Sequence, residues 1–268
     1  MFSREKNTLI GRAAGRRRLA ILSKALEHHT KSFLETLPIE SRMSGLDLGC
    51  RIGDVTFVLK DIVGDQGNIM GLDMDQTMIQ IAKDRLTDSH YSNIRFQALD
   101  IQHWNESNKY DFVYSRLFLN ELWNPSEILG KIHQALKPGG LVIIEDLDVS
   151  NFISYPPSTA FDQYINLHAT LKKLRGEDAK IGSKLEGLLV YNGFRSAETQ
   201  MVPPAFLTGV GKKVASLTLE YIGKELTKRD LISNEALNIL QRNLKHFEQH
   251  TLSLISLPAI YQAWAVKG

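Results

Sequence analysis

The stretch of residues 46–54, which reads LDLGCRIGD, decides the fold. Its two leucines have the pattern of the last apolar residues of a buried strand. Gly49 and Gly53 allow a tight turn in which the backbone comes close to a ligand. Asp54 stands where it can cap the helix that the turn opens, and the first N–H groups of that helix then face the turn. A strand, a glycine turn and a helix in this order are typical of a nucleotide-binding corner.

Strand and helix patterns alternate along the following hundred residues. After the strand that ends at Leu48, we expect strands at 68–72, 93–98, 110–114 and 141–145, and helices at 55–63, after Asp75, and after Asn124-Pro125. LKPGG at 136–140 is expected to stop the last of these helices. The alternation predicts an α/β fold, a Rossmann-like, mostly parallel sheet with helices on both faces. Ligands of such sheets bind beyond the carboxyl ends of the strands, where this chain has Gly49, Asp73, Asp100, Ser115, Arg116 and Glu145.

Composition narrows the class of protein. The chain has 268 residues, 43% hydrophobic and 23% charged, which suits one large α/β domain with an insertion. Its 32 basic and 30 acidic side chains leave a net charge of +2, without the basic excess of a nucleic-acid binder. Cys50 is the single cysteine, which excludes an intrachain disulfide and favours a reducing compartment. The sequence shows no signal-peptide pattern and no membrane span, so we expect a cytoplasmic protein.

Two acids follow the expected second and third strands. Asp73 lies 24 residues past Gly49, where an acid can accept hydrogen bonds from both ribose hydroxyls of an adenosine-type ligand. The alternative for Asp73 is a helix N-cap, a role for which Asp75 is better placed. Asp100 either meets an adenine amino group or caps a loop.

The glycine spacing separates two cofactor classes. A dinucleotide fingerprint needs G-x-G-x-x-G, and the spacing from Gly49 to Gly53 departs from it. Five segments in order instead resemble the class I S-adenosylmethionine-dependent methyltransferase family, and within it the ubiquinone/menaquinone-type small-molecule methyltransferases. The segments are LDLGCRIGD (46–54), GLDMD (71–75), FQALDI (96–101), YDFVYSRLFLN (110–120) and LKPGGLVIIE (136–145). Each segment alone is weak evidence for the family. The ordered set of five, which covers roughly residues 43–148, is specific for it.

The resemblance implies S-adenosylmethionine as the cofactor and assigns contacts to the matching positions. The glycine turn would line the methionine end, Asp73 would hold the ribose, and Met74 would pack on the adenine, whose far edge Asp100 and Ile101 would take. Ser115 and Arg116 would lie beside the sulfonium and the substrate. The implied cofactor-binding set is Asp47, Gly49, Cys50, Arg51, Gly53, Asp73, Met74, Met78, Asp100, Ile101, Ser115 and Arg116.

Arg51 departs from the family, which usually has glycine at this position. An outward side chain costs little if the backbone φ is negative. A side chain that intrudes on the site can pair with the carboxylate of the cofactor or block the pocket. The alternative function is therefore a non-catalytic protein on the same fold that binds a partner or another metabolite, with Arg51 filling the pocket.

The terminal segments are expected to provide substrate specificity. Residues 1–15 look flexible, and a helix is expected at 16–37, within an N-terminal helical cap at 1–40. Tyr155-Pro156-Pro157 predicts a turn into a helix at 159–173, and a further helix is expected before Gly193. The family implies a sixth strand near 196–202 and an antiparallel seventh at 252–266, which gives a core domain of 41–203 with 251–268. The insertion at 204–250 is expected to be a helical lid, or else a helix packed on the core or on a second subunit in a homodimer.

Methyl transfer is an in-line displacement that mainly requires donor and acceptor atoms held roughly 3–3.5 Å apart. A base is needed only if the acceptor loses a proton. Glu145 is the candidate base and Arg116 its catalytic neighbour, the alternative being an ion pair between them; His103 and His168 are weaker candidates. Asp146 and Asp148 could bind a metal but suit loop caps better, so we predict no metal. We expect methyl transfer to an O, N or C atom of a small, largely apolar metabolite; a third hypothesis is an RNA methyltransferase that uses Arg16–Arg18.

Overall fold

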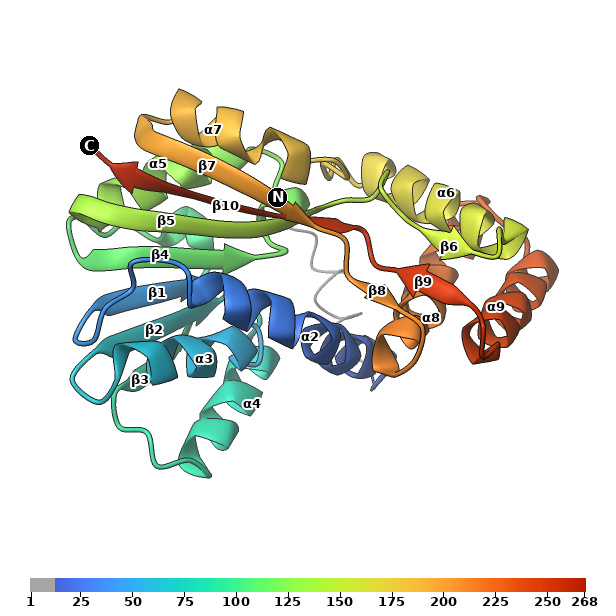
Figure 1. Cartoon of the computed structure of the whole chain (residues 1–268), viewed down its shortest axis with the longest axis horizontal. Coiled ribbons are helices and arrows are strands. Elements are labelled where there is room, and N and C mark those ends of the chain that lie inside the picture. The colour runs from blue at the N-terminus through green and yellow to red at the C-terminus, as the bar shows by residue number, and fades with distance from the viewer. Residues whose placement is uncertain (1–12) are drawn as a thin grey trace. The chain divides into compact units, whose positions relative to one another are not determined.

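Seven strands form the central sheet in the order β3-β2-β1-β4-β5-β10-β7 (Figure 1). The strands are β1 (Ser44–Leu48), β2 (Asn68–Asp73), β3 (Ile94–Ala98), β4 (Tyr110–Arg116), β5 (Leu136–Asp148), β7 (Phe194–Val202) and β10 (Ala259–Lys267). The pairs β1/β2, β1/β4, β2/β3 and β4/β5 are parallel. β10 runs antiparallel to the rest, so the predicted fold class is confirmed.

The computed structural model describes residues 13–268, and these residues divide into two compact units. We call the first the sheet unit, which comprises Thr30–Asp146, Ile181–Gln200 and Tyr261–Gly268. The helical unit comprises residues 13–29 together with Leu147–Lys180 and Met201–Ile260.

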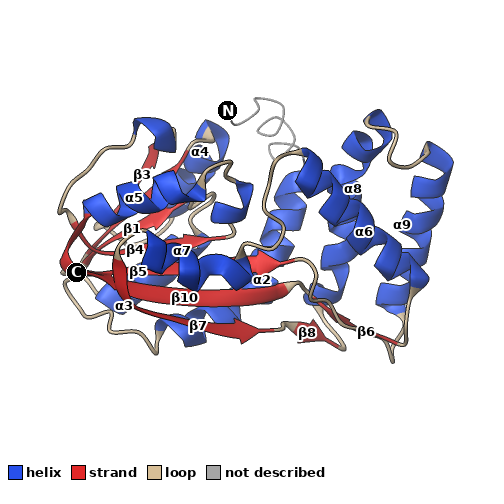
Figure 2. Cartoon of the chain, turned by 90° about the horizontal axis from the view of Figure 1, so that it is seen from above, coloured by secondary structure: helices blue, strands red, loops and turns tan. Residues whose placement is uncertain are grey.

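Helices cover both faces of the sheet (Figure 2). They are α3 (Asp54–Val63), α4 (Gln76–Thr87), α5 (Pro125–Ala135) and α7 (Leu185–Tyr191), with the short helices η1 (Ile101–His103), η2 (Leu119–Glu121) and η3 (Gly182–Lys184). The helix α2 (Ala13–Leu34) ends in the sheet unit.

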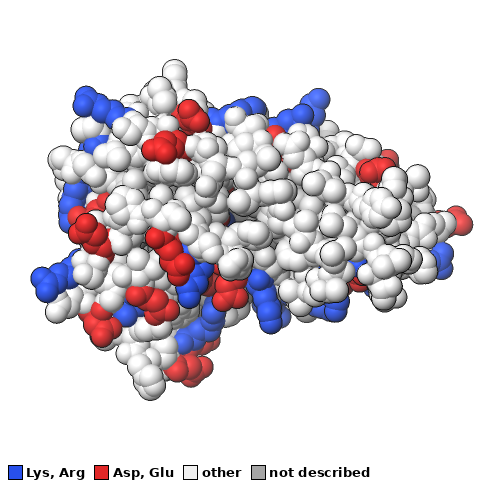
Figure 3. Space-filling model, viewed as in Figure 1, with Lys and Arg blue, Asp and Glu red and all other residues white. Residues whose placement is uncertain are grey.

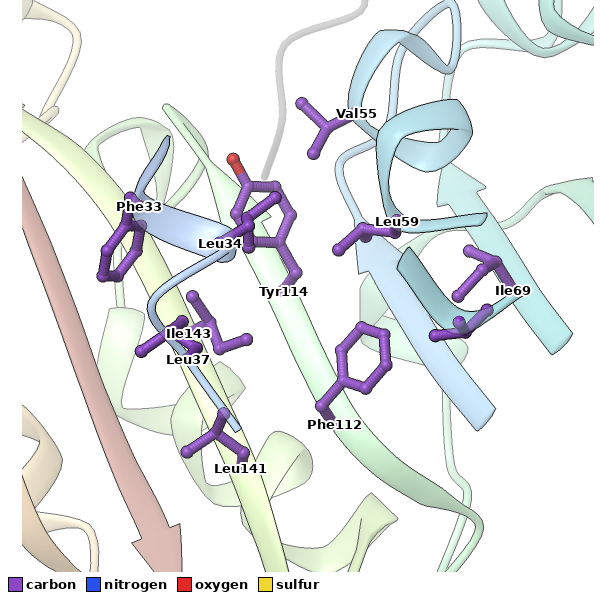
Figure 4. Packing of buried hydrophobic residues seen from close by; sticks show 11 residues of the cluster. Phe33, Leu34, Leu37, Val55, Leu59, Ile69, Phe112, Tyr114, Leu141 and Ile143 are labelled. Carbon is purple, nitrogen blue, oxygen red and sulfur yellow. The ribbon is translucent and has the colours of Figure 1, made fainter. Parts of the chain in front are cut away.

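The core of the sheet unit follows from the alternation of side chains along a strand. Phe112 and Tyr114 of β4 and Ile143 of β5 pack with residues of α3 and the end of α2 (Figure 4). The residues between them, such as Val113 and Val142, are also fully buried and belong to the opposite face. Burial on both faces explains why these strands read as nearly continuous apolar runs.

The helical unit has a hydrophobic core of its own. Its remaining elements are α6 (Thr159–Leu174), α8 (Val214–Lys228), α9 (Asn234–Gln249), η4 (Val210–Lys213), β6 (Ser154–Tyr155), β8 (Ala205–Phe206) and β9 (Leu254–Ser256). The three short strands form a second, antiparallel sheet. Phe161 and Tyr164 of α6 are buried with Leu219 of α8 and Leu244 of α9. The helices expected in the insertion therefore exist, and their role as a lid stays a prediction.

Three expectations about element boundaries were wrong. Helix α2 already includes residues 13–15, which we expected to be flexible, and it ends at Leu34 rather than at residue 37; residues 1–12 lie outside the described part of the chain. The expected turn at 136–140 is part of β5, where the register shifts between the pairs Tyr110/Leu136 and Phe112/Leu141. The expected seventh strand is divided into β9 and β10. The division falls at Pro258, which has no N–H to donate to a sheet.

Candidate functional site

The glycine turn after β1 has the backbone that the sequence predicts. Gly49 and Gly53 have φ angles of 77° and 81°. A Cβ at Gly49 would lie 2.8 Å from a ring carbon of Phe118, and a Cβ at Gly53 would lie 2.6 Å from the ring of Phe96. The N–H groups of Gly49 and Cys50 both donate to the carbonyl oxygen of Leu72 at the end of β2, at 2.8 and 3.0 Å. The turn is therefore fixed to the neighbouring strand and admits only glycine at both positions.

The start of α3 differs from the prediction. Asp54 was expected to cap this helix, but the N-cap is Gly53, and no side chain caps the helix. The Asp54 carboxylate instead accepts a hydrogen bond from Arg85 at 2.7 Å. The first N–H groups of α3 thus keep the donor capacity that suits a polar or anionic ligand group.

Asp73 links two loops at the end of β2. Its Oδ2 accepts from the backbone N–H of Arg51 at 3.0 Å, and its Oδ1 accepts from that of Asp75 at 2.9 Å. A carboxylate offers about four acceptor positions, so two remain for hydroxyl donors. Burial raises the pKa of Asp73, and its hydrogen bond from Asp75 and the charge of Arg51 oppose that rise.

The residues expected on the adenine side lie on the next loops. Asp75 caps α4 by accepting from the N–H groups of Thr77 and Met78, as predicted. Asp100 caps η1 by accepting from the N–H of Gln102 at 3.0 Å. Met74 is half-buried, whereas Met78 and Ile101 are buried. Asp100 thus does act as a loop cap, and the contacts of these residues with adenine stay predictions.

Arg51 has a left-handed backbone, with φ of 53°. The negative φ at which an outward side chain costs little is therefore not present. The guanidinium Nη2 instead lies 3.3 Å from Glu121 Oε1 and 3.5 Å from the carbonyl oxygen of Leu117. Leu117 follows β4 and also has φ of 53°. Two non-glycine residues in an unfavourable conformation therefore meet at the ends of β1 and β4.

Asp47 is a buried carboxylate next to the same turn. It is 3% exposed, and its Oδ2 accepts a hydrogen bond from Thr56 Oγ1 of α3 at 2.6 Å. Burial raises the pKa of Asp47 from 3.8 to about 7, although Thr56 and the charge of Arg116 favour the ionised form. Cys50, its neighbour along the turn, is packed with Ile79 and Phe96, and burial raises the pKa of its thiol.

Glu145 is a buried acceptor inside β5, which runs on to Asp148 rather than ending at residue 145 as expected. It is 1% exposed and accepts hydrogen bonds from Tyr114 at 2.6 Å, Gln262 at 2.9 Å and Thr30 at 3.2 Å. Arg116 Nη1 donates to Thr30 Oγ1 at 2.9 Å. Glu145 and Arg116, which are register partners of β5 and β4, are therefore connected through Thr30. The catalytic roles of both stay predictions.

The remaining predicted polar residues have structural partners. Ser115 Oγ donates to the carbonyl oxygen of Leu48 at 2.9 Å and ties β4 to β1. Asp146 accepts from the N–H and the side-chain amide of Asn120, and Asp148 accepts from Ser150. Asp148 thus caps its own loop, the alternative to metal ligation, whereas Asp146 binds Asn120 of η2, a helix without a side-chain cap. Within residues 13–268, no three side chains of the metal-binding types are grouped to hold an ion.

The two candidate histidines lie in different units. His103 ends η1 of the sheet unit. His168 lies on α6 of the helical unit, where its ring stacks on Tyr164. Its Nδ1 is buried and unpaired within the described chain. Burial and nearby cations, first Lys172, lower the pKa of His168. His168 thus belongs to the helical unit, whereas Glu145 belongs to the sheet unit.

Sequence reasoning missed several polar residues that build the site. They are Thr30, Thr56, Tyr114, Asn120, Glu121 and Gln262. Gln262 carried a usable signal, since a glutamine within the apolar run of the last strand must find a buried partner. Tyr114 lies on β4 and the others on helices, and their pairing depends on the tertiary fold.

Taken together, the fold and the turn define an α/β protein with a nucleotide-type site at the ends of β1, β2 and β4. Residues 39–193, more than half of the chain, match the family model described as "Methyltransferase domain". The chain belongs to the class I S-adenosylmethionine-dependent methyltransferase family, whose cofactor is S-adenosylmethionine.

Similar proteins support the same family. The chain is 29% identical over 149 residues to the demethylmenaquinone methyltransferase of Lactobacillus johnsonii, which covers 54% of this chain and 60% of that protein. The chain spans about half the length of the curated relatives that it matches. Among solved structures, the YcgJ protein of Bacillus subtilis has a TM-score of 0.61 at 14% identity, over 90% of this chain and 98% of that chain. The Haemonchus contortus phosphoethanolamine N-methyltransferase 2 has a TM-score of 0.55 at 21% identity, over 94% of this chain and 52% of that chain. At these identities the two structures show the fold alone.

No helix among residues 13–268 combines the length and the apolar character that crossing a membrane requires.

Proposed function

We propose that this protein transfers a methyl group from S-adenosylmethionine to a small, largely apolar molecule. The observation that carries the proposal is Asp73, whose carboxylate is fixed by two backbone N–H groups and retains acceptor capacity for two hydroxyls. The Arg51 N–H that Asp73 binds belongs to the glycine turn, which follows Asp47 of β1.

The residues of the site fit the cofactor by their chemistry. At Gly49 and Gly53 the rings of Phe118 and Phe96 occupy the Cβ positions, so glycine lets the turn pack closely against its neighbours. Asp47 is a buried acid beside this turn. S-adenosylmethionine supplies an electrophilic methyl group on a positively charged sulfur. Asp73 binds the ribose, the turn binds the methionine end, and buried apolar residues around Met78 and Ile101 exclude water from the adenine side.

Arg116 and Glu145 are the proposed catalytic residues. Arg116 is held by Thr30, and Thr30 is held by Glu145, so the three side chains form one chain of hydrogen bonds. Glu145 accepts from three donors, so about one of the four acceptor positions of its carboxylate remains to take a proton from the acceptor. An acceptor that carries no proton to be lost needs no such step.

The helical unit is the proposed source of acceptor specificity. Its aromatic side chains are the reason for proposing an apolar acceptor, and they divide into two kinds. Phe161 and Tyr164 are core residues, 1% and 3% exposed, whereas Tyr155 is 67% exposed and Tyr221 is half-buried. The half-buried and exposed aromatics, rather than the core ones, are the candidates for contact with an apolar acceptor.

Two observations favour a small molecule over RNA as the acceptor. Arg18 Nε donates to Thr218, and its guanidinium lies over the ring of Tyr221, so Arg18 is used inside the helical unit. On the face shown in Figure 3, acidic and basic side chains of the described residues are mixed, without a continuous basic stripe.

Calorimetric titration with S-adenosylmethionine tests the cofactor site. Loss of two hydrogen bonds to a charged acceptor in Asp73→Ala should weaken binding about a hundredfold. Asp75→Ala is the matched control, because it removes the cap of α4 and leaves the Asp73 carboxylate in place. Unchanged affinity in Asp73→Ala would remove the ribose assignment.

An activity assay separates the enzyme from a non-catalytic protein on the same fold. Formation of S-adenosylhomocysteine is followed with phenols, apolar amines and a short RNA as acceptors. Turnover with a small apolar acceptor supports the proposal. Cofactor binding without turnover of any acceptor would favour the non-catalytic alternative. Turnover of RNA alone, with binding that falls steeply as salt is added, would favour the RNA methyltransferase.

A further inference from the structure

The ion pair between Arg51 and Glu121 joins the cofactor turn to the segment after β4. The Arg51 Nη2 atom lies 3.3 Å from Glu121 Oε1, and each side chain is 23% exposed. Both residues belong to the sheet unit. Arg51 stands between the two glycines that the family resemblance assigns to the methionine end of the cofactor. The Arg51 side chain therefore leaves the backbone at the turn where the carboxylate of the ligand is expected.

Both partners rest on well-fixed backbone. The Arg51 N–H donates to Asp73, and its left-handed φ sets the direction in which the side chain leaves the turn. Glu121 ends η2, whose Asn120 is held to buried Asp146 by two hydrogen bonds. An exchange of partners by Arg51 therefore requires a rotation of its side chain and no movement of the turn.

The chemistry of Glu121 matches that of the amino-acid tail. Each offers a carboxylate to a guanidinium, and a guanidinium binds carboxylates better than other acceptors because its N–H groups match the two oxygens. The pair is part-buried, and a ligand carboxylate gives Arg51 an interaction of the same kind, so the exchange has a low cost.

We propose that Glu121 holds Arg51 in the free protein and that the carboxylate of the S-adenosylmethionine tail replaces Glu121 on binding. The inference rests on the proposed function and assigns a role to each residue. Arg51 recognises the tail carboxylate, and Glu121 competes with it. Glu121 consequently sets the affinity for ligands that carry the tail and has no effect on those that lack it.

Calorimetry with two ligands tests the exchange. S-adenosylmethionine carries the amino-acid tail, whereas 5′-methylthioadenosine has the adenosyl group and sulfur without it. Glu121→Gln should tighten S-adenosylmethionine binding about two- to fivefold, the range of a partly exposed ion pair, and leave 5′-methylthioadenosine binding unchanged. Glu127→Gln, an exposed acid on the neighbouring α5, is the matched control for the loss of one negative charge and should change neither affinity.

A double variant shows whether Glu121 acts through Arg51. Arg51→Gly has the residue usual in the family and relieves the left-handed backbone, so it should fold. In this background Glu121→Gln should no longer change the affinity for S-adenosylmethionine, because Arg51, the group for which the two carboxylates compete, is absent. A persisting effect, or an equal effect on both ligands, would overturn the exchange. Wild-type protein that binds neither ligand would overturn the proposed function and the exchange with it, whereas normal binding with no Glu121→Gln effect would overturn the exchange alone.

Discussion

Arg51 and Leu117 show how single residues can carry conformational cost at a site. Both have φ of 53°, and the carbonyl oxygen of Leu117 accepts from the guanidinium of Arg51. A left-handed residue other than glycine costs roughly 1–2 kcal/mol, which the surrounding structure has to offset. For Leu117 the offset includes the burial of its side chain and a hydrogen bond from its N–H to the carbonyl oxygen of Glu145. Such pairs of unfavourable residues mark places where geometry serves the ligand rather than stability.

The buried carboxylate of Asp47 makes the stability of the free protein depend on pH. The folded protein has a pKa of about 7 at Asp47, above the ordinary 3.8, so it keeps a proton that the unfolded chain releases. The contribution of Asp47 to the free energy of unfolding is therefore greatest below pH 4. It falls as pH rises toward 7, by roughly 4 kcal/mol at most.

Asp47→Asn should flatten this dependence in urea denaturation at pH 5 and pH 8. The variant keeps an acceptor for Thr56 and carries no charge, so it should exceed wild type in stability at pH 8. The matched control Asp162→Asn, at an exposed position of α6, should keep the wild-type difference between the two pH values. An unchanged difference in Asp47→Asn would show that Asp47 is ionised across the range.

Residue roles differ in how far they could be read from the sequence. Asp75, Asn124 and Ser158 cap helices, as their local patterns indicate, because a cap binds N–H groups two or three residues away. Glu145 could be recognised as the acid that ends an apolar run. Its partners Thr30 and Gln262 lie 115 and 117 residues away in sequence, and only the fold brings them together.

Among elements, the connection from β4 to α5 depends on one buried clamp. Asp146 is fully buried, and Asn120 donates to both of its oxygens, at 3.0 and 2.8 Å. Loss of the carboxylate leaves the two donors of Asn120 without this acceptor. Asp146→Ala should therefore lower the free energy of unfolding by about 3 kcal/mol, measured by urea denaturation.

The clamp also fixes η2 and with it Glu121, the proposed competitor of the cofactor tail, so Asp146→Ala should tighten S-adenosylmethionine binding while it lowers stability. Asp148→Ala is the control two residues further on, where the acid binds only the neighbouring Ser150 in the hydrogen bonds that the structure records. It should cost about 1 kcal/mol and leave S-adenosylmethionine affinity unchanged. An equal loss of unfolding free energy in both variants would show that the contact of Asp146 with Asn120 contributes no more than the local cap of Asp148.

Helices and strands differ in how well the sequence predicts them. Strands that are buried on both faces, such as those around Leu46 and Val113, have apolar runs that clearly indicate a buried strand. The bulge of β5 was missed because it depends on pairing with β4, whereas the division between β9 and β10 had a local signal in Pro258 that the prediction did not use. Pairing of Tyr110 with Leu136 extends β5 across Pro138 and Gly139, residues that by themselves indicate a turn.

Across the whole molecule, the two units have separate cores. Leu59 of α3 is fully buried in the core of the sheet unit, and Leu244 of α9 is 2% exposed in that of the helical unit. Leu59→Ala and Leu244→Ala should each cost 2–5 kcal/mol in the unit that contains the residue, because each leaves a cavity among well-packed neighbours. The residues proposed to hold the cofactor all lie in the sheet unit.

Hydrogen exchange of the two variants, with and without S-adenosylmethionine, tests whether the units also open separately. Leu244→Ala should speed amide exchange in α6, α8 and α9 and leave β1, β4 and the cofactor affinity unchanged. Leu59→Ala should speed exchange in β1, α3 and β4, and cofactor at a hundred times its Kd should restore about 2.7 kcal/mol of that protection, since binding stabilises only the state that contains the site. Faster exchange of β1 and β4 in Leu244→Ala, to the same degree as in α9, would mean that the two cores open as one. In that case the helical unit would influence the cofactor site through stability as well as through any contact with the acceptor.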